Sequence, residues 1–211
     1  MAADWVTISS LATAGGTLVL AVATFGSVRS ANRAARVAEE SLLAGIRPLL
    51  MPSRFDDPKQ KVGFADNHYV AVEGGCGTAE VTDDAVYLTL SIRNAGNGIA
   101  VLHGWRFHPG RILTGDYSPD MSGFRRLTRD LYTPSGDVGF WQGAFRDATE
   151  PEFAEARDAI VAREPLTIEL LYGDHQGAQR IITMFSLMPW QDGRWMATVG
   201  RHWNIDRPDP R

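Results

Sequence analysis

The sequence predicts a mainly β protein in which an N-terminal transmembrane helix and a helical stalk precede an antiparallel β-sandwich with one inserted helix. Three observations support this fold class. The 24 residues from Trp5 to Val28 contain no charged side chain. Apolar residues then keep a helical spacing as far as Pro48, and a helix is expected to end there because proline disfavours helical geometry in the preceding residue. Beyond Pro48 the dominant hydrophobic period is two, which is typical of β-strands.

Composition and charge exclude several classes of protein. Hydrophobic residues make up 44% and charged residues 22% of the 211 residues, which is close to a globular average and excludes a wholly disordered chain. A single cysteine, Cys76, excludes a disulfide-stapled fold and a multi-cysteine metal site. The formal net charge of -4 argues against nucleic acid as a partner, because neutralising phosphates requires a basic surface.

The uncharged segment 5–28 has the length of a membrane span. As a helix it would extend about 36 Å, which is enough to cross a hydrocarbon core of about 30 Å. A cleaved signal peptide is the alternative, since Ala21-Val22-Ala23 has the form of a cleavage site, but the residues before the span carry Asp4 and no Lys or Arg. We therefore expect a short tail at 1–4 and an uncleaved helix at 5–28 that contacts membrane lipid.

Basic residues after the span predict its orientation. Arg29, Arg33, Arg36 and Arg47 follow the span. The positive-inside rule then places the N-terminus outside the cell membrane and the C-terminal domain in the cytoplasm. Small residues recur at four-residue spacing within the span, which would let two helices approach closely.

The stalk at 29–46 continues the helix of the span, so that one helix is expected from Trp5 to Ile46. Three interpretations of the stalk remain open. It forms a coiled-coil seam between protomers, it lies on anionic lipid with its arginines toward the headgroups, or it is a solvated helix. A homo-oligomer through the span or the stalk is compatible with the first of these.

The domain at 47–205 is predicted chiefly from alternating hydrophobicity. Ala85–Arg93 is the clearest strand, and Asn94–Gly98 after it indicates a hairpin turn into a return strand at Ile99–His108. Thr149-Glu150-Pro151-Glu152 predicts the start of a helix as a capping box. Segment 109–148 is either short strands or a long loop. The other expected elements are a first strand at 49–51, three consecutive antiparallel strands at 166–172, 179–188 and 194–203 with the middle one central, a helix at about 150–163, and a C-terminal tail at 206–211.

Two turn motifs are the most distinctive local patterns. Arg47-Pro48-Leu49-Leu50 begins the first strand, and Asn94-Ala95-Gly96-Asn97-Gly98-Ile99-Ala100 follows the clearest strand. Together with the N-terminal span, they make the chain resemble a group of uncharacterised bacterial membrane-tethered proteins of the actinobacterial type. The resemblance implies a single-pass anchor in a bacterial cell membrane and an immunoglobulin-like sandwich, and it brings no catalytic residues.

Signals for catalysis or metal binding are weak. The sequence contains no phosphate-cradling loop, no nucleophile elbow and no HExxH motif, so we expect no catalytic, cofactor-binding or metal site. His103 shares a strand face with Trp105, which predicts a core histidine, and packing is also the expected role of His202. Cys76 in a glycine-rich segment is expected to be an exposed thiol without an activating neighbour.

Residues that could contact a partner lie in the poorly assigned segment and in one late turn. An aromatic pair is expected to be exposed at 140–141, arginines at 125 and 126 are suited to anionic lipid or an acidic partner, and a turn at 174–175 is expected at the surface. The predicted contact residues are Phe140, Trp141, Arg125, Arg126, Asp174 and His175.

These features predict a membrane-anchored, non-enzymatic interaction or scaffold module that binds another protein. One alternative is an accessory subunit of a larger membrane complex, with the span packed against other helices. The other is an enzyme or small-ligand receptor whose site is assembled from His103, His175 and His202 with Asp174.

Overall fold

The computed structural model describes residues 2–112, 115 and 117–206, and it divides into two units, 1–44 and 45–211. Met1 and residues 207–211, which belong to the predicted terminal tails, lie outside the described residues.

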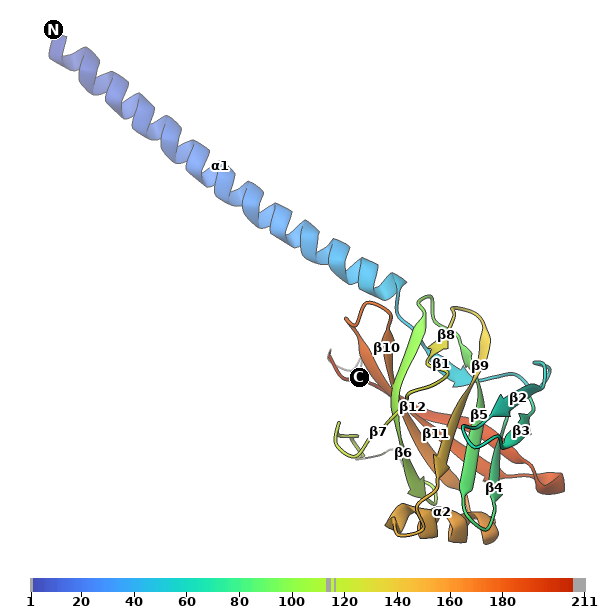
Figure 1. Cartoon of the computed structure of the whole chain (residues 1–211). Helices are drawn as coiled ribbons and strands as arrows, with labels where there is room; N and C mark the ends of the chain where they lie inside the picture. Colours follow the sequence, from blue (N-terminus) through green and yellow to red (C-terminus); the bar gives the residue numbers. More distant parts are fainter. Residues whose placement is uncertain (1, 113–114, 116, 207–211) are drawn as a thin grey trace. The chain divides into compact units, whose positions relative to one another are not determined.

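The first unit is the long helix α1, which spans Ala2–Gly45 (Figure 1). It begins before the predicted span, so residue 5 does not mark a helix boundary. The helix is long and apolar enough to cross a membrane. Several of its hydroxyl groups donate within the helix: Thr13 Oγ1 donates to the Ser9 carbonyl at 2.8 Å, and Thr17 Oγ1 donates to the Thr13 carbonyl at 2.8 Å. Such bonds lower the cost of placing hydroxyl groups among lipid chains.

The second unit is a mostly antiparallel β-sheet domain. Its described residues form a ten-stranded sheet in the order β1-β5-β4-β12-β11-β10-β6-β7, with β8 also on β6 and β9 also on β5, and a separate hairpin of β2 and β3 (Figure 1). The strands are β1 (Leu50–Pro52), β2 (Gln60–Gly63), β3 (Tyr69–Val72), β4 (Cys76–Val81), β5 (Val86–Asn94), β6 (Ala100–Pro109), β7 (Arg125–Arg126), β8 (Tyr132–Thr133), β9 (Val138–Phe145), β10 (Leu166–Asp174), β11 (Arg180–Pro189) and β12 (Trp195–Asn204).

Local periodicity predicts the last three strands and the inserted helix correctly. β11 pairs with β10 on one side and with β12 on the other, as expected for a central strand. Helix α2 (Pro151–Val161) has proline in its first turn and buries Phe153, Ala156 and Ile160. The predicted capping box is wrong, because the N-cap residue is Glu150 and its side chain makes no capping bond among the described residues. Thr149 Oγ1 instead donates to Asp147.

The main core lies between the inner faces of β5, β6, β9, β10 and β11, and α2 packs against it. Trp105 of β6 meets Trp141 of β9 edge to face, with 5.2 Å between ring centroids. Gly143 makes this pair possible, since a Cβ at that position would lie 2.6 Å from the Trp141 ring and 2.9 Å from the Trp105 ring. The two indoles therefore join strands that are far apart in the sheet order.

The hairpin predicted between β5 and β6 is wrong. In the described sheet β5 pairs with β1, β4 and β9, and β6 pairs with β7, β8 and β10. Because other strands occupy both edges of β5, the chain crosses from one part of the sheet to another at 95–99. The turn residues have a different role, which is to hold the chain as it enters the domain.

We call the turn Asn94–Gly98 the clasp, because it makes hydrogen bonds and close backbone contacts to residues 46–49. The Asn94 side chain accepts the Leu49 N–H at 3.1 Å and donates to the carbonyls of Gly98 and Thr133 at 2.6 and 3.0 Å. A Cβ at Gly98 would lie 1.7 Å from the Ile46 carbonyl oxygen. Only glycine allows so close a backbone approach, which explains why a glycine occupies this position.

Segment 109–148 contains short strands, one long strand and a covering segment. β7 and β8 are short, whereas β9 pairs with β5 over its whole length. Ile112, Tyr117 and Phe124 pack on a second apolar cluster formed by Leu171, Ile182, Met184 and Trp203. The segment thus covers the outer face of β10, which is buried along its whole length.

Candidate functional site

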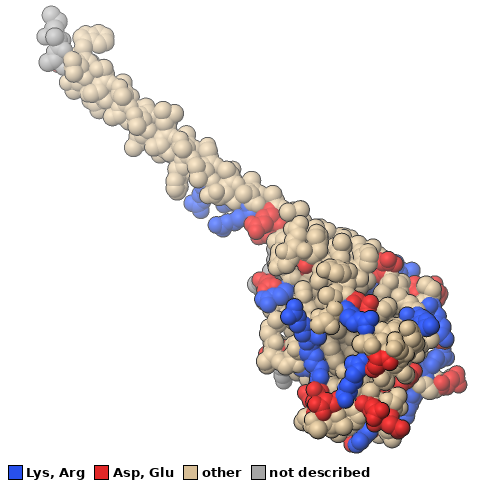
Figure 2. All heavy atoms as spheres, in the orientation of Figure 1, with Lys and Arg blue, Asp and Glu red and all other residues tan. Residues whose placement is uncertain are grey.

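A cleft of about 250 Å³ lies where segment 125–129 runs beside β9. We call it the arginine cleft. Its lining residues are Phe64, Ala65, Trp105, Arg125, Arg126, Leu127, Thr128, Arg129, Gln142, Gly143, Ala144 and Arg146. Four of these described residues are arginines and none is acidic. On the face of the domain shown in Figure 2, acidic and basic side chains are interspersed.

Arg125 is fixed between aromatic rings and acidic side chains. Its guanidinium group lies 4.8 Å from the ring centroid of Phe145 and 5.8 Å from that of Trp105. It donates a hydrogen bond to Glu150, and Glu152 lies 3.8 Å away. Stacking and ion pairing together hold the guanidinium group across the inner end of the cleft.

Arg146 is fixed from the other side by Asp66. Arg146 Nε donates to Asp66 Oδ2 at 2.8 Å, and the Tyr87 hydroxyl donates to the same oxygen at 2.8 Å. Burial alone would raise the pKa of Asp66, but the hydrogen bonds from Arg146 and Tyr87 lower that pKa to about 2. Asp66 is therefore ionised throughout the physiological pH range and keeps Arg146 in place.

Arg126 and Arg129 are exposed and form no ion pair with a described carboxylate. The backbone of Arg126 is held by the pairing of β7 with Gly104 of β6. Asp130 lies beside the cleft, where it accepts a hydrogen bond from Gln142 Nε2 and is not a lining residue. Two guanidinium groups at the rim are thus available to an anion.

The predicted aromatic contact at 140–141 is wrong for Trp141, which is 1% exposed. Trp141 faces the core because β9 alternates between its two faces when it pairs with β5. Phe140 points the other way but is half-buried, because it packs on the cluster formed by the β2–β3 hairpin and Tyr87. The sequence could not show that a hairpin covers this face.

Asp174 and His175 lie in the turn between β10 and β11, and neither lines the arginine cleft. Asp174 is 2% exposed, which corrects its expected surface position. Its Oδ1 accepts the N–H groups of Gln176 and Ala178 at 2.8 and 3.2 Å, so its role is to build the turn. His175 is exposed, as expected.

The prediction of a core position for His103 is wrong, because the side chain is exposed. The register between β6 and β10 shifts between Leu171 and Tyr172, which leaves His103 without a partner residue on β10. Leu102 and Trp105 both face the core on either side of this bulge. A one-residue irregularity of this kind cannot be read from alternation.

His202 is half-buried and its Nδ1 lies 2.7 Å from Thr183 Oγ1, which also bonds the Tyr172 hydroxyl at 2.9 Å. Burial and the nearby Arg47 lower the pKa of His202. Among residues 2–112, 115 and 117–206, no group of three or more His, Cys, Asp or Glu side chains is placed to hold a metal ion.

Cys76 is 5% exposed and begins β4, so the expected exposed thiol is wrong. Burial raises the pKa of the thiol, which makes it a poor nucleophile at neutral pH. The glycines around it serve close packing, since a Cβ at Gly77 would lie 2.5 Å from the Leu187 side chain.

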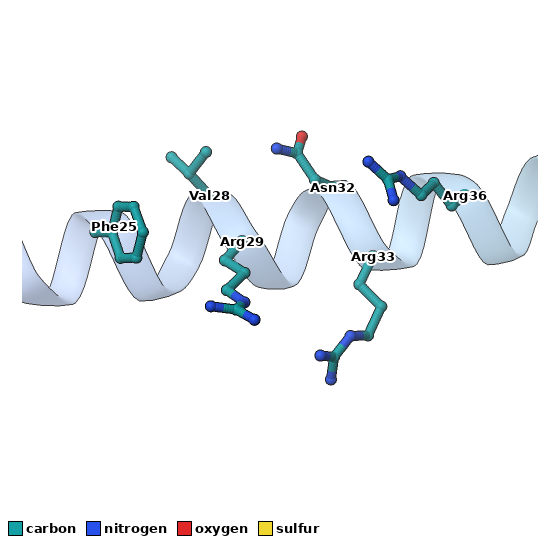
Figure 3. Close-up of a pocket in the computed structure, with 6 residues that line it drawn as sticks. All are labelled: Phe25, Val28, Arg29, Asn32, Arg33 and Arg36. Carbon is teal, nitrogen blue, oxygen red and sulfur yellow. The ribbon is translucent and has the colours of Figure 1, made fainter.

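A second arginine group lies on α1, just after the uncharged segment. Phe25, Val28, Arg29, Asn32, Arg33 and Arg36 line a shallow groove there. Figure 3 shows Arg29 and Arg33 extending to one side of the helix, and Val28, Asn32 and Arg36 extending to the other. Because residues 29, 33 and 36 are spaced i, i+4 and i+7, their backbone positions share one face of the helix, and the positive charge is concentrated along that face.

Comparison of the chain with protein-family models, with curated proteins and with solved structures finds no match.

Proposed function

We propose that this protein is a single-pass, membrane-anchored and non-enzymatic interaction module of a bacterial cell membrane, and that the arginine cleft binds an acidic group on a protein partner. The observation that carries this proposal is the cleft itself, in which four arginines and no acidic residue line about 250 Å³. Guanidinium groups match the planar geometry of carboxylate and phosphate groups.

For the sheet domain we propose an immunoglobulin-like sandwich. In support, strands at distant positions in the sheet order face each other across one core, as Trp105 of β6 and Trp141 of β9 do. The antiparallel pairing of every strand and the layer of apolar residues between the two faces are also typical of sandwiches.

For the membrane topology we propose that the N-terminus is outside and the sheet domain is cytoplasmic, since Arg29, Arg33 and Arg36 directly follow the uncharged segment of α1. Cys76 is unsuitable as a reporter because it is buried. In a Cys76→Ala variant carrying Gln176→Cys at an exposed turn, we expect a membrane-impermeant maleimide to label the protein only after cell lysis. Labelling of intact cells to the same extent would show that the sheet domain lies outside the cell, which is the opposite topology.

Removing the two unpaired arginines is expected to abolish partner binding. We expect tagged full-length protein, solubilised in mild detergent, to retain a stoichiometric partner in the wild type and to lose at least about 90% of it when Arg126 and Arg129 are both replaced by alanine. Arg157→Ala is the matched control, because Arg157 is exposed on α2 and its ion pair with Asp158 is at the surface.

Equal retention of the partner by the double variant would contradict the proposed role of the cleft. Association through residues 5–28, as an accessory subunit or a homo-oligomer, would then be the better explanation. An enzymatic or small-ligand site near His103, His175 and His202 has less support, because these side chains lie on an exposed bulge, in a turn and against Thr183 respectively.

A further inference from the structure

The arginine cleft carries more positive charge than one carboxylate neutralises. Arg125 and Arg146 are held by ion pairs to acidic residues outside the lining, whereas Arg126 and Arg129 have no such pair with a described residue. A carboxylate brings one negative charge, but a phosphomonoester brings about 1.5 to 2 at pH 7. The two guanidinium groups that form no ion pair therefore match the double charge of a phosphomonoester better than the single charge of a carboxylate.

The donors of the cleft also suit a group with several acceptor oxygens. Each guanidinium group presents a rigid fork of N–H donors, and two forks from different directions can bind different oxygens of one phosphate. Ion pairs already hold Arg125 and Arg146, so only the Arg126 and Arg129 side chains have to lose conformational freedom when an anion binds at the cleft. The Thr128 side chain adds a hydroxyl group to the lining.

The size of the cleft favours a side chain of a partner over a free metabolite. Its volume of about 250 Å³ is below the range of about 300–1,000 Å³ that is typical of small-molecule pockets. A phosphate and the first carbon atoms attached to it are small enough to suit a cleft of this size. Phe64, Trp105 and Leu127 provide apolar surface for those carbon atoms.

A membrane lipid is the other source of phosphate. Arg29, Arg33 and Arg36 on α1 directly follow the uncharged segment and already offer positive charge to lipid headgroups, so headgroup binding does not require the cleft.

From charge, donor geometry and size, we propose that the acidic group bound in the arginine cleft is a phosphorylated side chain of a protein partner. This inference rests on the proposed function of the cleft. It makes the interaction switchable, because phosphorylation of the partner would create the binding determinant.

The test compares three nonapeptide pools that differ only at the central position, which is phosphoserine, glutamate or serine, with the flanking positions degenerate. Full-length protein in phosphatidylcholine nanodiscs is titrated into each fluorescent pool, and anisotropy is recorded at constant salt. We expect the phosphoserine pool to bind at least tenfold more tightly than the glutamate pool, and the serine pool not to bind. Replacing Arg126 and Arg129 by alanine is expected to weaken phosphoserine binding at least tenfold, whereas Arg157→Ala leaves it unchanged.

Each of the other possible outcomes contradicts a specific proposal about the cleft. Equal affinity for the phosphoserine and glutamate pools overturns this inference and leaves the proposed acidic-partner function intact. Binding of neither acidic pool overturns both. Tighter binding of dibutyryl phosphatidic acid, a soluble lipid with a phosphomonoester, than of the phosphoserine pool assigns the cleft to membrane lipid instead. Loss of binding in Arg157→Ala as well as in the double variant shows that general charge, and not the cleft, is responsible.

Discussion

Replacement of Asn94 by alanine is expected to destabilise the sheet domain by about 3–5 kcal/mol, because the change removes several buried hydrogen bonds at once. Asn94 is fully buried and its side chain bonds the Leu49 and Gly96 N–H groups and the carbonyls of Gly98 and Thr133. An alanine would leave these backbone groups without that partner. Each buried unsatisfied group costs about 1–3 kcal/mol.

Asn97 provides the matched control for this prediction. It belongs to the same turn and has the same side chain, but it is exposed, and the contact it makes to Arg47 comes from its backbone N–H. Asn97→Ala is therefore expected to change stability by no more than about 0.5 kcal/mol. Urea unfolding of the full chain in detergent micelles, followed by tryptophan fluorescence, compares the two variants. Equal urea midpoints for the two variants would show that the Asn94 side chain contributes no more to stability than the exposed Asn97 side chain.

Replacement of Arg106 by methionine is expected to cost about 3–5 kcal/mol, because it leaves a buried carboxylate without its cation. The Glu169 side chain is 0% exposed, and its Oε2 accepts hydrogen bonds from Arg106 Nε at 2.8 Å and from Arg106 Nη2 at 2.6 Å. His108 Nε2 lies 3.2 Å from the same oxygen. Glu169 Oε1 has no hydrogen-bond partner among the described residues.

Arg106 also contacts the part of segment 109–148 that covers β10. It donates to the Ser122 carbonyl and to the Tyr117 hydroxyl, both at 2.9 Å, and its guanidinium group lies 4.9 Å from the Phe124 ring centroid. Burial and the Glu169 carboxylate raise the pKa of Tyr117 to about 12, so this hydroxyl stays protonated. Loss of Arg106 is therefore expected to loosen the covering segment as well as to expose the carboxylate.

The double variant Arg106→Met/Glu169→Leu separates these effects. Because it removes the buried charge together with its partner, it is expected to recover most of the stability that Arg106→Met loses. Urea midpoints of wild type, both single variants and the double variant form the complete cycle. Additive losses would show that Arg106 and Glu169 do not interact energetically.

The same cluster predicts how stability depends on pH. Burial acts to raise the pKa of Glu169, but the hydrogen bonds from His108 and Arg106 outweigh it and lower that pKa below its usual value. A lowered carboxyl pKa contributes stability above the unfolded-state value of about 4.3, and this contribution is lost as the pH falls through the folded-state value. Glu169→Gln is expected to lose this acid-dependent part of the stability curve. An unchanged curve below pH 5 would contradict the assignment.

Local sequence information is sufficient to predict most elements of this protein. The absence of charge at 5–28 and the helical spacing after it predict α1, and alternation predicts β5, β10, β11 and β12 to within about two residues. Pro151 and Pro165 bracket α2 for the same local reason, since proline fits the first turn of a helix and disfavours helical geometry before it. The sequence also suggests Arg125 and Arg126 as contact residues, which stays a prediction.

Features that depend on distant partners could not be predicted. The Asn94–Gly98 turn has the residues of a hairpin, yet the neighbours of β5 are β1, β4 and β9. The turn therefore contacts residues 46–49 and does not connect two paired strands. The burial of Trp141 follows from the pairing of β9 with β5 and from its contact with Trp105. The exposure of His103 follows from the bulge opposite Leu171 and Tyr172.

The arginine cleft also depends on contacts between distant segments, which the sequence does not show. Its lining combines residue 64, residue 105, segment 125–129 and segment 142–146, which only the folded sheet brings together. The sequence by itself determined where the chain is helical or extended and where it can cross a membrane, because hydrophobic period and charge act over neighbouring residues. The tertiary structure alone decided which strands pair, which side chains are buried and which arginines surround one cleft, because pairing and burial result from competition among segments far apart in the chain.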